Sequence, residues 1–317
     1  MEIVRLKHPR PLLKLPPTAV ALGFFDGVHR GHQKVIEVAK TEAKDRGLKS
    51  AVMTFFPHPK EVLRNEEEIQ YLSPLPEKIK LMEGLGIDYL FIVTFDRHFA
   101  DLSPQQFVDE YLIDLNVKHV VAGFDYSYGR LGKGTMETLP FHSRKQFTQT
   151  TVKEISNGEE KISSTEIRKA LSKGNIDKVN TYLGRMFQIE GLVEHGEKRG
   201  RTIGFPTANI SPVERTVFPD IGVYTVFIQV DGEWLPGVCN VGFKPTFHNN
   251  SPVKPTIEVH ILDFQSDLYG KEVIVAFYNR IRGEKKFASV EELKQQISTD
   301  VTQARGSIKD GVRNECY

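Results

Sequence analysis

The chain has 317 residues, of which 42 are Lys or Arg and 41 are Asp or Glu, and its formal net charge is +1. This length predicts two domains, and 39% hydrophobic with 26% charged residues is typical of globular chains with sizeable cores. The balanced charge argues against a nucleic-acid-binding protein. The two cysteines at unrelated positions argue against a disulfide-rich or secreted protein, and no apolar run approaches the roughly 18 residues that span a bilayer. The expected location is therefore cytoplasmic.

The first half alternates apolar runs with helical patterns. Buried strands are predicted at Ala19–Phe25, Ala51–Phe56, Tyr89–Phe95 and His119–Gly123. A helix is predicted over Gln33–Arg46, and Ser103 followed by Pro104 is typical of the start of another helix. This alternation predicts an α/β domain with a parallel sheet and right-handed crossovers.

The second half, after about Leu183 and Gly184, has strands that follow one another closely. They are predicted at Phe187–Glu194, Gly222–Val230, Glu233–Val241, Thr256–Leu262 and Glu272–Tyr278. Asp231 and Gly232 predict a hairpin turn, and Ser289 with Glu292 predicts a capped terminal helix. Many short strands with one terminal helix indicate a small antiparallel barrel.

The segment Gly23–His32 follows the first predicted strand and precedes the first predicted helix. Ligands of open α/β sheets lie at this edge, glycines let the backbone approach a phosphate, and helix-start amides attract anions. His29 and His32 are three residues apart, so both side chains can face one ligand and stabilise charge on a transferring phosphate. The alternative is a glycine-rich turn with two exposed histidines.

A second motif, Lys161–Arg168, combines hydroxyl groups with a new helix. Ser163 and Glu166 match a capping box, which would by itself explain both residues. Hydroxyls, helix-start amides and Arg168 together would also form a phosphate-binding site.

A third motif, Gly204–Asn209, lies in the second half. Thr207 and Asn209 are two apart in an extended segment, so they point the same way and offer oxygen ligands suited to Mg²⁺. Gly196 and the Arg-Gly-Arg segment at 199–201 could form a flap over nucleotide phosphates. The alternative is a proline turn beside a positively charged loop.

Glu258 lies on the polar face of the strand Thr256–Leu262. There it could act as a general base at the mouth of a barrel. A solvated acidic residue is the alternative that periodicity alone favours.

With these motifs in view, the sequence resembles the bacterial bifunctional riboflavin kinase/FAD synthetase family over nearly its whole length. The resemblance is carried by Gly23–His32, Thr54–Pro59, Gly123–Gly129 and Ile162–Arg168 in the first half, and by Gly200–Asn209, Gly237–Gly242 and Ile257–Val259 in the second. It implies a Rossmann-like FMN adenylyltransferase domain over residues 1–183. A riboflavin kinase domain, a six-stranded β-barrel with a C-terminal helix, would follow over residues 184–317.

The resemblance also implies roles for single residues. ATP for adenylyl transfer would be bound by His29 and His32, which would also be catalytic, together with Gly23, Asp26, Gly31, Ser163, Ser164 and Arg168; Asp125 would lie near the flavin. In the kinase, ATP would be bound by Gly196, Arg201, Gly204 and Pro206. Thr207 and Asn209 would hold Mg²⁺, and Glu258 would be the base. The polar tail Gly306–Tyr317 departs from the end expected of a terminal helix.

The implied activity has two steps. ATP phosphorylates riboflavin to FMN, and a second ATP adenylylates FMN to FAD with release of pyrophosphate, so Mg²⁺ is the expected cofactor and small molecules are the expected partners. No nucleic-acid or membrane partner is expected, and the sequence leaves open whether the chain forms a homo-oligomer. An adenylyltransferase with an inactive kinase half would show a broken Thr-x-Asn or a missing glutamate, and both are intact. A flavin-binding regulator would need a nucleic-acid-binding surface that the neutral charge does not support.

Overall fold

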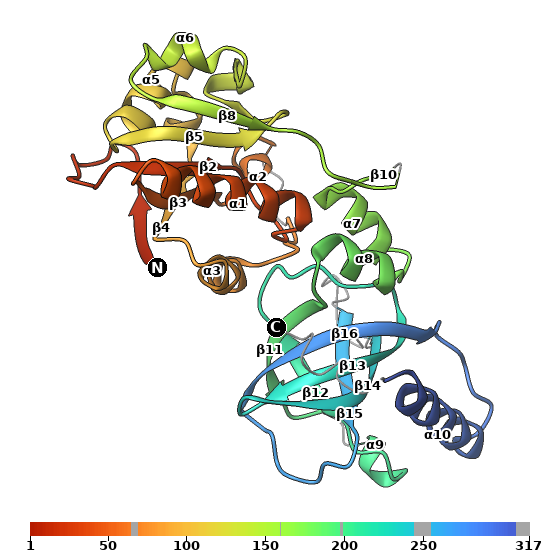
Figure 1. Cartoon of the computed structure of the whole chain (residues 1–317). Helices are drawn as coiled ribbons and strands as arrows, with labels where there is room; N and C mark the ends of the chain where they lie inside the picture. The colour runs from red at the N-terminus through yellow and green to blue at the C-terminus, as the bar shows by residue number, and fades with distance from the viewer. Residues whose placement is uncertain (65–68, 159, 197–198, 244–254, 309–317) are drawn as a thin grey trace. The chain divides into compact units, whose positions relative to one another are not determined.

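The structure is a computed structural model of the chain, and it describes residues 1–64, 69–158, 160–196, 199–243 and 255–308. Two compact units make up the chain, Met1–Ser163 and Ser164–Tyr317 (Figure 1). The boundary that the sequence predicts, between residues 183 and 184, lies further along the chain, because two helices that precede it belong to the second unit.

The first unit is built on a six-stranded sheet. Its strands are β1 (Glu2–Leu6), β2 (Thr18–Leu22), β3 (Lys49–Phe56), β4 (Tyr89–Thr94), β5 (Val117–Gly123) and β8 (Thr148–Val152), in the order β1-β4-β3-β2-β5-β8. Every neighbouring pair is parallel, which confirms the Rossmann-like α/β class. The outer strands β1 and β8 were not among the predicted strands.

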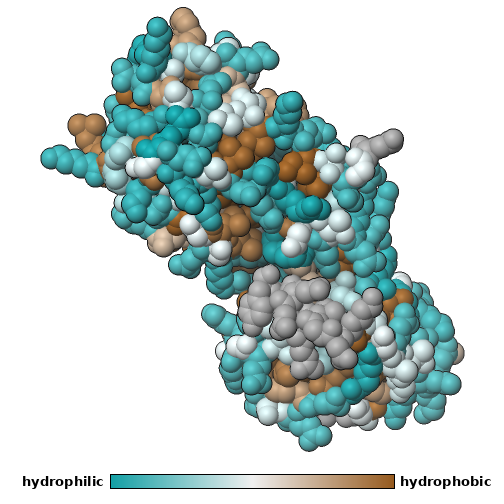
Figure 2. Space-filling view, in the orientation of Figure 1, coloured by the Kyte–Doolittle hydropathy of each residue, from teal (hydrophilic) through white to brown (hydrophobic). Residues whose placement is uncertain are grey.

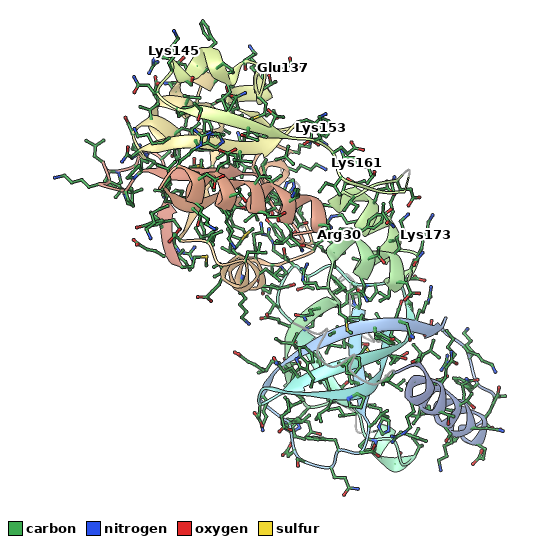
Figure 3. The ribbon with its side chains drawn as sticks, viewed as in Figure 1. Arg30, Glu137, Lys145, Lys153, Lys161 and Lys173 are labelled. Atoms are coloured by element: carbon green, nitrogen blue, oxygen red, sulfur yellow. The ribbon has the colours of Figure 1, made fainter. Side chains whose placement is uncertain are left out.

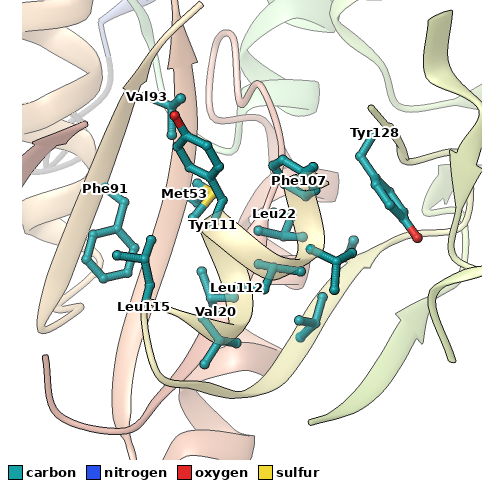
Figure 4. Packing of buried hydrophobic residues seen from close by; sticks show 14 of the residues in the cluster. Val20, Leu22, Met53, Phe91, Val93, Phe107, Tyr111, Leu112, Leu115 and Tyr128 are labelled. Atoms are coloured by element: carbon teal, nitrogen blue, oxygen red, sulfur yellow. The ribbon is translucent and has the colours of Figure 1, made fainter. Parts of the chain in front are cut away.

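Helices cover both faces of this sheet. On one face, α1 (Arg30–Asp45) and α3 (Leu75–Gly84) pack over a cluster that includes Ala21 and Val52. On the other face, α5 (Pro104–Val108) and a π-helix (Asp109–Ile113) pack over Val20 and Leu22 (Figure 4). Successive β2 residues thus point to opposite cores, which explains why all residues of the strand are buried.

Short elements complete the first unit. They are α2 (Pro59–Arg64), α4 (Arg97–Ala100), a 3₁₀ helix (Arg130–Gly132), α6 (Leu139–Ser143), and the paired strands β6 (Ser127–Tyr128) with β7 (Gly134–Thr135) and β9 (Ser156–Asn157) with β10 (Glu160–Lys161). The predicted start at Ser103 and Pro104 is confirmed, because the Ser103 hydroxyl accepts from the Gln106 amide in a full capping box.

The second unit is a closed antiparallel barrel. Its strands are β11 (Phe187–Glu194), β12 (Ala208–Pro212), β13 (Gly222–Val230), β14 (Glu233–Phe243), β15 (Pro255–Ile261) and β16 (Glu272–Arg282), in the order β11-β12-β15-β14-β13-β16. The expected six-stranded barrel is confirmed. The predicted hairpin also forms, since Asp231 and Gly232 have φ values of 50° and 88° between β13 and β14.

Four helices are described in the second unit, α7 (Ser164–Leu171), α8 (Ile176–Leu183), α9 (Arg199–Thr202) and α10 (Val290–Ser307). The Ser289 hydroxyl caps α10 by accepting from the Glu292 amide at 3.1 Å, as predicted. Gly306 and Ser307 continue this helix, so the expected irregular tail begins later; residues 309–317 lie outside the described part of the chain.

Figure 2 shows a mainly hydrophilic face in which hydrophobic side chains surface in separate patches. Among the described residues, no helix combines the length and the apolar character that crossing a membrane requires.

Candidate active sites

The segment that joins β2 to α1 lies at the switch point of the parallel sheet. β2 pairs with β3 on one side and with β5 on the other. The strand order therefore changes direction at β2, and the chain leaves this strand at the switch point. Ligands of open α/β sheets bind in the crevice at such carboxyl ends. The fold therefore places Gly23–His32 and the segment after β5 at the same edge.

The turn after β2 is held in an unusual backbone path by contacts from a distant segment. Phe25, Gly27 and Val28 all have positive φ values, of 54°, 80° and 42°. Oδ1 of buried Asp26 accepts from the amides of Leu72 and Ser73 at 3.0 and 3.2 Å. The Gly27 amide donates to the Ser73 hydroxyl at 2.8 Å. Asp26, predicted to bind ATP, thus lies inside the turn and fixes its shape.

Two glycines of this turn allow aromatic rings to approach the backbone. A Cβ atom on Gly23 would lie 2.7 Å from the ring of Phe25, and one on Gly31 would lie 3.1 Å from the ring of His29. Larger residues at either position would push these rings away. Gly23 and Gly31 therefore support the site through packing.

His29 and His32 form a stacked pair at the start of α1. Their ring centroids are 3.5 Å apart with an interplanar angle of 18°. Nδ1 of His29 accepts from the His32 amide at 3.3 Å and so caps the helix, which places the proton of a neutral His29 ring on Nε2. The prediction that both residues face one place is consistent with this stacking.

His32 is held neutral by its surroundings. Burial, the neighbouring His29 ring and the ammonium of Lys78 lower the pKa of His32 well below its usual value. Its Nδ1 atom is buried and has no hydrogen-bond partner among the described residues. A buried, unpartnered ring nitrogen next to a helix N-terminus is suited to binding a polar ligand group.

Asp125 follows β5, where the resemblance predicts the flavin. Its carboxylate is exposed and pairs at 3.4 Å with Lys161, which is labelled in Figure 3. The same ammonium lies 3.3 Å from Glu154 and 4.8 Å from the centroid of the Phe124 ring. Phe124 is 49% exposed. An exposed aromatic ring beside a charged pair is suited to a flat, polar ligand.

The second motif is divided between the units. Ser163 is the last residue of the first unit, while Ser164 and Arg168 lie four residues apart on one face of α7 in the second. Their predicted binding of ATP together with His29 and His32 stays a prediction.

In the second unit, a tight turn leads from α9 into β12. The Gly200 carbonyl accepts from the amides of Ile203 and Phe205, and Gly204 has a φ of 89°. The Pro206 carbonyl accepts from Nδ1 of His260 at 2.9 Å, which ties the turn to β15. Gly204 and Pro206 thus shape the segment that carries Thr207, and Arg201 lies in α9, with its side chain outside the described part of the structure.

Asn209 and Glu258 lie directly opposite each other on neighbouring strands. The register pairs Asn209 of β12 with Glu258 of β15, and Glu258 with Asn240 of β14. In β15 the apolar residues Ile257 and Val259 are buried, so Glu258 points to the other face. Directly opposed residues have Cβ atoms about 4.5–5.5 Å apart, so the predicted metal ligand and the predicted base are neighbours.

Two glycines bring the preceding loop against these residues. A Cβ atom on Gly196 would lie 2.1 Å from Nδ2 of Asn209, and one on Gly200 would lie 3.4 Å from Oγ1 of Thr207. The structure therefore brings Gly196, Thr207, Asn209 and Glu258 together from three segments of the chain.

The donor atoms at this site are hydroxyl, amide and carboxylate oxygens. No group of three His, Cys, Asp or Glu side chains able to hold a metal converges within the described ranges. A divalent ion here would be bound by few protein oxygens, with the remaining ligands coming from substrate phosphates and water, as is usual for Mg²⁺. The site thus fits Mg²⁺.

Sequence reasoning missed Lys78 and Asn240. Lys78 occurs in α3 at the spacing of the apolar residues Leu75, Ile79 and Met82, and a charged residue on an apolar stripe is a detectable signal. Asn240 alternates with the buried residues Cys239 and Val241, which predicts its side chain on the same face as Glu258.

The chain is similar to known proteins over both units. A family model for FAD synthetase matches residues 13–166, and a model for riboflavin kinase matches residues 183–308. A crystal structure of a Streptococcus pneumoniae protein described as a macrolide-efflux protein has a TM-score of 0.89 and 34% identity, covering 97% of this chain and 100% of that one.

Two curated relatives carry both activities in their names. The bifunctional riboflavin kinase/FMN adenylyltransferase of Bacillus subtilis is 47% identical over 96% of this chain and 97% of its own length. The enzyme of the same name from Escherichia coli is 38% identical over the same shares. Since such identity extends over both units, the chain belongs to the bifunctional riboflavin kinase/FMN adenylyltransferase family.

Proposed function

We propose that the second unit forms FMN and that the first unit forms FAD, each on the residues described above. Membership of the family makes riboflavin, ATP, FMN and FAD the substrates and products of this enzyme. The order of the two family models along the chain supports this division between the units.

In the kinase reaction, the ribityl 5′-hydroxyl of riboflavin attacks the γ-phosphorus of ATP and ADP leaves. Glu258 accepts the proton of that hydroxyl, a role for which a positioned carboxylate is suited. The observation that carries this proposal is the direct pairing of Glu258 with Asn209 between β15 and β12.

Thr207 and Asn209 would bind Mg²⁺ through their side-chain oxygens. Gly196 supports this assignment, because the loop that precedes α9 approaches Asn209 so closely that a methyl group would not fit. When bound, Mg²⁺ would neutralise charge on the phosphates of ATP. The nucleotide would then be covered by the loop of Gly196 together with α9, which contains Arg201.

In the adenylyltransferase reaction, a phosphate oxygen of FMN attacks the α-phosphorus of ATP and pyrophosphate leaves. His29, with its proton on Nε2, would donate to a phosphate oxygen, and His32 lies stacked against it. Ser163, at the end of the first unit, would add a further donor to the phosphates, and Asp125 would contact the flavin. Positioning and charge stabilisation suffice for this transfer without a protein nucleophile.

We further infer a cytoplasmic location and no nucleic-acid partner. Both inferences are supported by the near-zero net charge and by the small-molecule nature of the family's substrates.

Two substitutions, each assayed in both reactions, test the assignment. Glu258→Gln keeps the size of the side chain but cannot take a proton, so FMN formation should fall about 10²–10⁴-fold, the usual contribution of a general base.

His29→Ala should lower FAD formation from supplied FMN about 10²–10³-fold, the loss expected when one transition-state donor is removed. Riboflavin, FMN and FAD would be separated chromatographically after incubation with ATP and Mg²⁺.

Each substitution should leave the other reaction at its wild-type rate. The matched control is Glu272→Gln, since Glu272 is an exposed carboxylate at the start of β16 in the same unit, and this variant should retain both activities. If Glu258→Gln forms FMN within about threefold of wild type, Glu258 is a surface residue and the base lies elsewhere.

A further inference from the structure

A lysine from α3 reaches into the turn that carries the two histidines. Lys78 is 1% exposed, although its residue type is almost never fully buried without a partner. Its Nζ atom donates to the Phe24 carbonyl at 2.9 Å and lies 4.3 Å from the centroid of the Phe24 ring. A charged hydrogen bond and a cation–π contact to the same residue are both strengthened by burial.

The Phe24 carbonyl also accepts from the buried hydroxyl of Thr54 at 2.9 Å. Two donors, one from β3 and one from α3, therefore hold the backbone immediately before the positive-φ residues Phe25, Gly27 and Val28. This path determines where α1 begins and thus where His29 and His32 lie. Loss of one donor would leave a buried carbonyl less well satisfied and the turn less constrained.

The ammonium of Lys78 also acts through its charge. Burial lowers the pKa of Lys78 to about 8, an effect that the carboxylate of Asp26 opposes, so the side chain is mostly protonated at neutral pH. Its charge is one of the causes that lower the pKa of His32. The titratable groups around it are Asp26, His29 and His32 from the turn and α1, with His58 and Tyr71 packed on the Phe24 ring.

We propose that Lys78 is a positioning residue of the adenylyltransferase site, which fixes the turn between β2 and α1 through the Phe24 carbonyl and keeps a positive charge beside His32. The inference rests on the proposed roles of His29 and His32. It assigns to α3, an element that none of the motifs includes, a direct influence on their placement and protonation.

The test replaces Lys78 with Met in the full chain, which keeps much of the side-chain volume but removes both donor and charge. FAD formation from FMN should fall about 10- to 100-fold in kcat/KM, the size expected from slight misplacement of catalytic groups. FMN formation should stay at the wild-type rate. Lys40→Met is the matched control, because Lys40 also donates to a backbone carbonyl, that of Leu85, away from the turn; it should leave both reactions unchanged.

A second readout separates positioning from general structural support. In protein labelled with ¹³C-histidine, the signal of His32, assigned through a His32→Gln spectrum, is followed against pH. Removing a nearby positive charge makes protonation of His32 easier, so the midpoint should move to higher pH in Lys78→Met. A purely structural lysine would not shift this titration in a folded variant.

The outcomes distinguish the inference from the proposed function. If His29→Ala impairs FAD formation but folded Lys78→Met does not and His32 titrates as in wild type, the role of Lys78 is overturned. If His29→Ala itself forms FAD at the wild-type rate, the proposed role of the histidines fails, whatever Lys78→Met shows. If Lys78→Met does not fold, Thr54→Val replaces it as the test, because this variant removes the other donor to the Phe24 carbonyl. Reduced FAD formation in Thr54→Val would support the positioning of the turn, and FAD formation at the wild-type rate would contradict it.

Discussion

Gly196 shows how one missing side chain shapes the kinase site. The loop that contains it approaches β12 so closely that a Cβ atom would lie 2.1 Å from Nδ2 and 2.4 Å from Cγ of Asn209, well inside van der Waals contact. Gly196, three residues before the short helix α9, is thus placed against a predicted Mg²⁺ ligand. Room for the Asn209 side chain depends on this glycine.

Gly196→Ala should therefore impair the kinase while the barrel stays folded. The added methyl group would displace the Asn209 side chain, so FMN formation should fall about 10- to 100-fold and should need more Mg²⁺ for half-maximal rate. Initial rates against Mg²⁺ concentration at saturating ATP measure this effect. The control is Gly306→Ala in α10, where a Cβ atom would meet nothing within 4 Å, and this variant should keep the wild-type Mg²⁺ dependence. An unchanged Mg²⁺ dependence in Gly196→Ala would show that Asn209 does not bind the metal.

The functional residues that a sequence can predict are those whose residue type is unusual at their position in the hydrophobic pattern. His29, His32, Thr207 and Asn209 were selected from their motifs. Periodicity alone favoured a solvated Glu258, and the family resemblance gave this residue its predicted role as the base. The pairing of Asn209 with Glu258 required the register of β12, which the motif itself obscured because its proline indicated a turn. Lys78 was missed because a lysine in a helix is ordinarily solvated, and only tertiary packing shows its burial.

At the scale of elements, the sequence predicted the strands that contain a continuous run of apolar residues. It did not predict the edge strands or the short strands. β2, β3, β4 and β5 are central and buried on both faces, which produces long apolar runs. β1 and β8 are the outer strands of the sheet, and β8 reads Thr-Gln-Thr-Thr-Val without an apolar run. β12 is only five residues long, and its pairing depends on neighbours distant in sequence.

Helix α8 is tied to the barrel through one side chain. Nδ2 of Asn180 donates to the Phe277 carbonyl at 2.9 Å, and Oδ1 accepts from the Phe187 amide at 2.8 Å. One asparagine thus links α8 to both β11 and β16. These partly buried bonds join α8 to two strands that pair with each other in the barrel.

Asn180→Ala should destabilise the second unit by about 1–3 kcal/mol, because it leaves a buried amide and carbonyl without their partners. The only tryptophan of the chain, Trp234, is buried in this unit, so its fluorescence during urea unfolding measures the effect. Thr181→Ala is the control, since the Thr181 hydroxyl is exposed and bonds only within α8. Equal unfolding midpoints for the two variants would show that Asn180 does not join α8 to the barrel.

For the whole molecule, we propose that the two reactions are divided between units that differ in architecture. The segment between the two family models belongs to the second unit. That segment, with α7 and α8, is described with the barrel. Arg280 of β16 donates to the Lys173 carbonyl at 2.9 Å and to Asp220 at 2.7 Å, and the Asp220 amide donates to the Leu171 carbonyl. The barrel therefore forms hydrogen bonds with residues that precede the boundary that sequence alone predicts.

Fragments that begin at residues 164 and 184 should consequently behave differently. The fragment 164–317 keeps α7, α8 and their bonds to β16, so it should fold and form FMN at the rate of the full chain. The fragment 184–317 loses the Asn180 bonds and the buried side chains of Val179 and Tyr182, and each buried apolar side chain contributes about 1.5–3 kcal/mol. It should unfold at lower urea by Trp234 fluorescence, with FMN formation reduced in proportion to its unfolded fraction. Equal stability of the two fragments would show that α7 and α8 do not stabilise the barrel and would support the predicted boundary at 183.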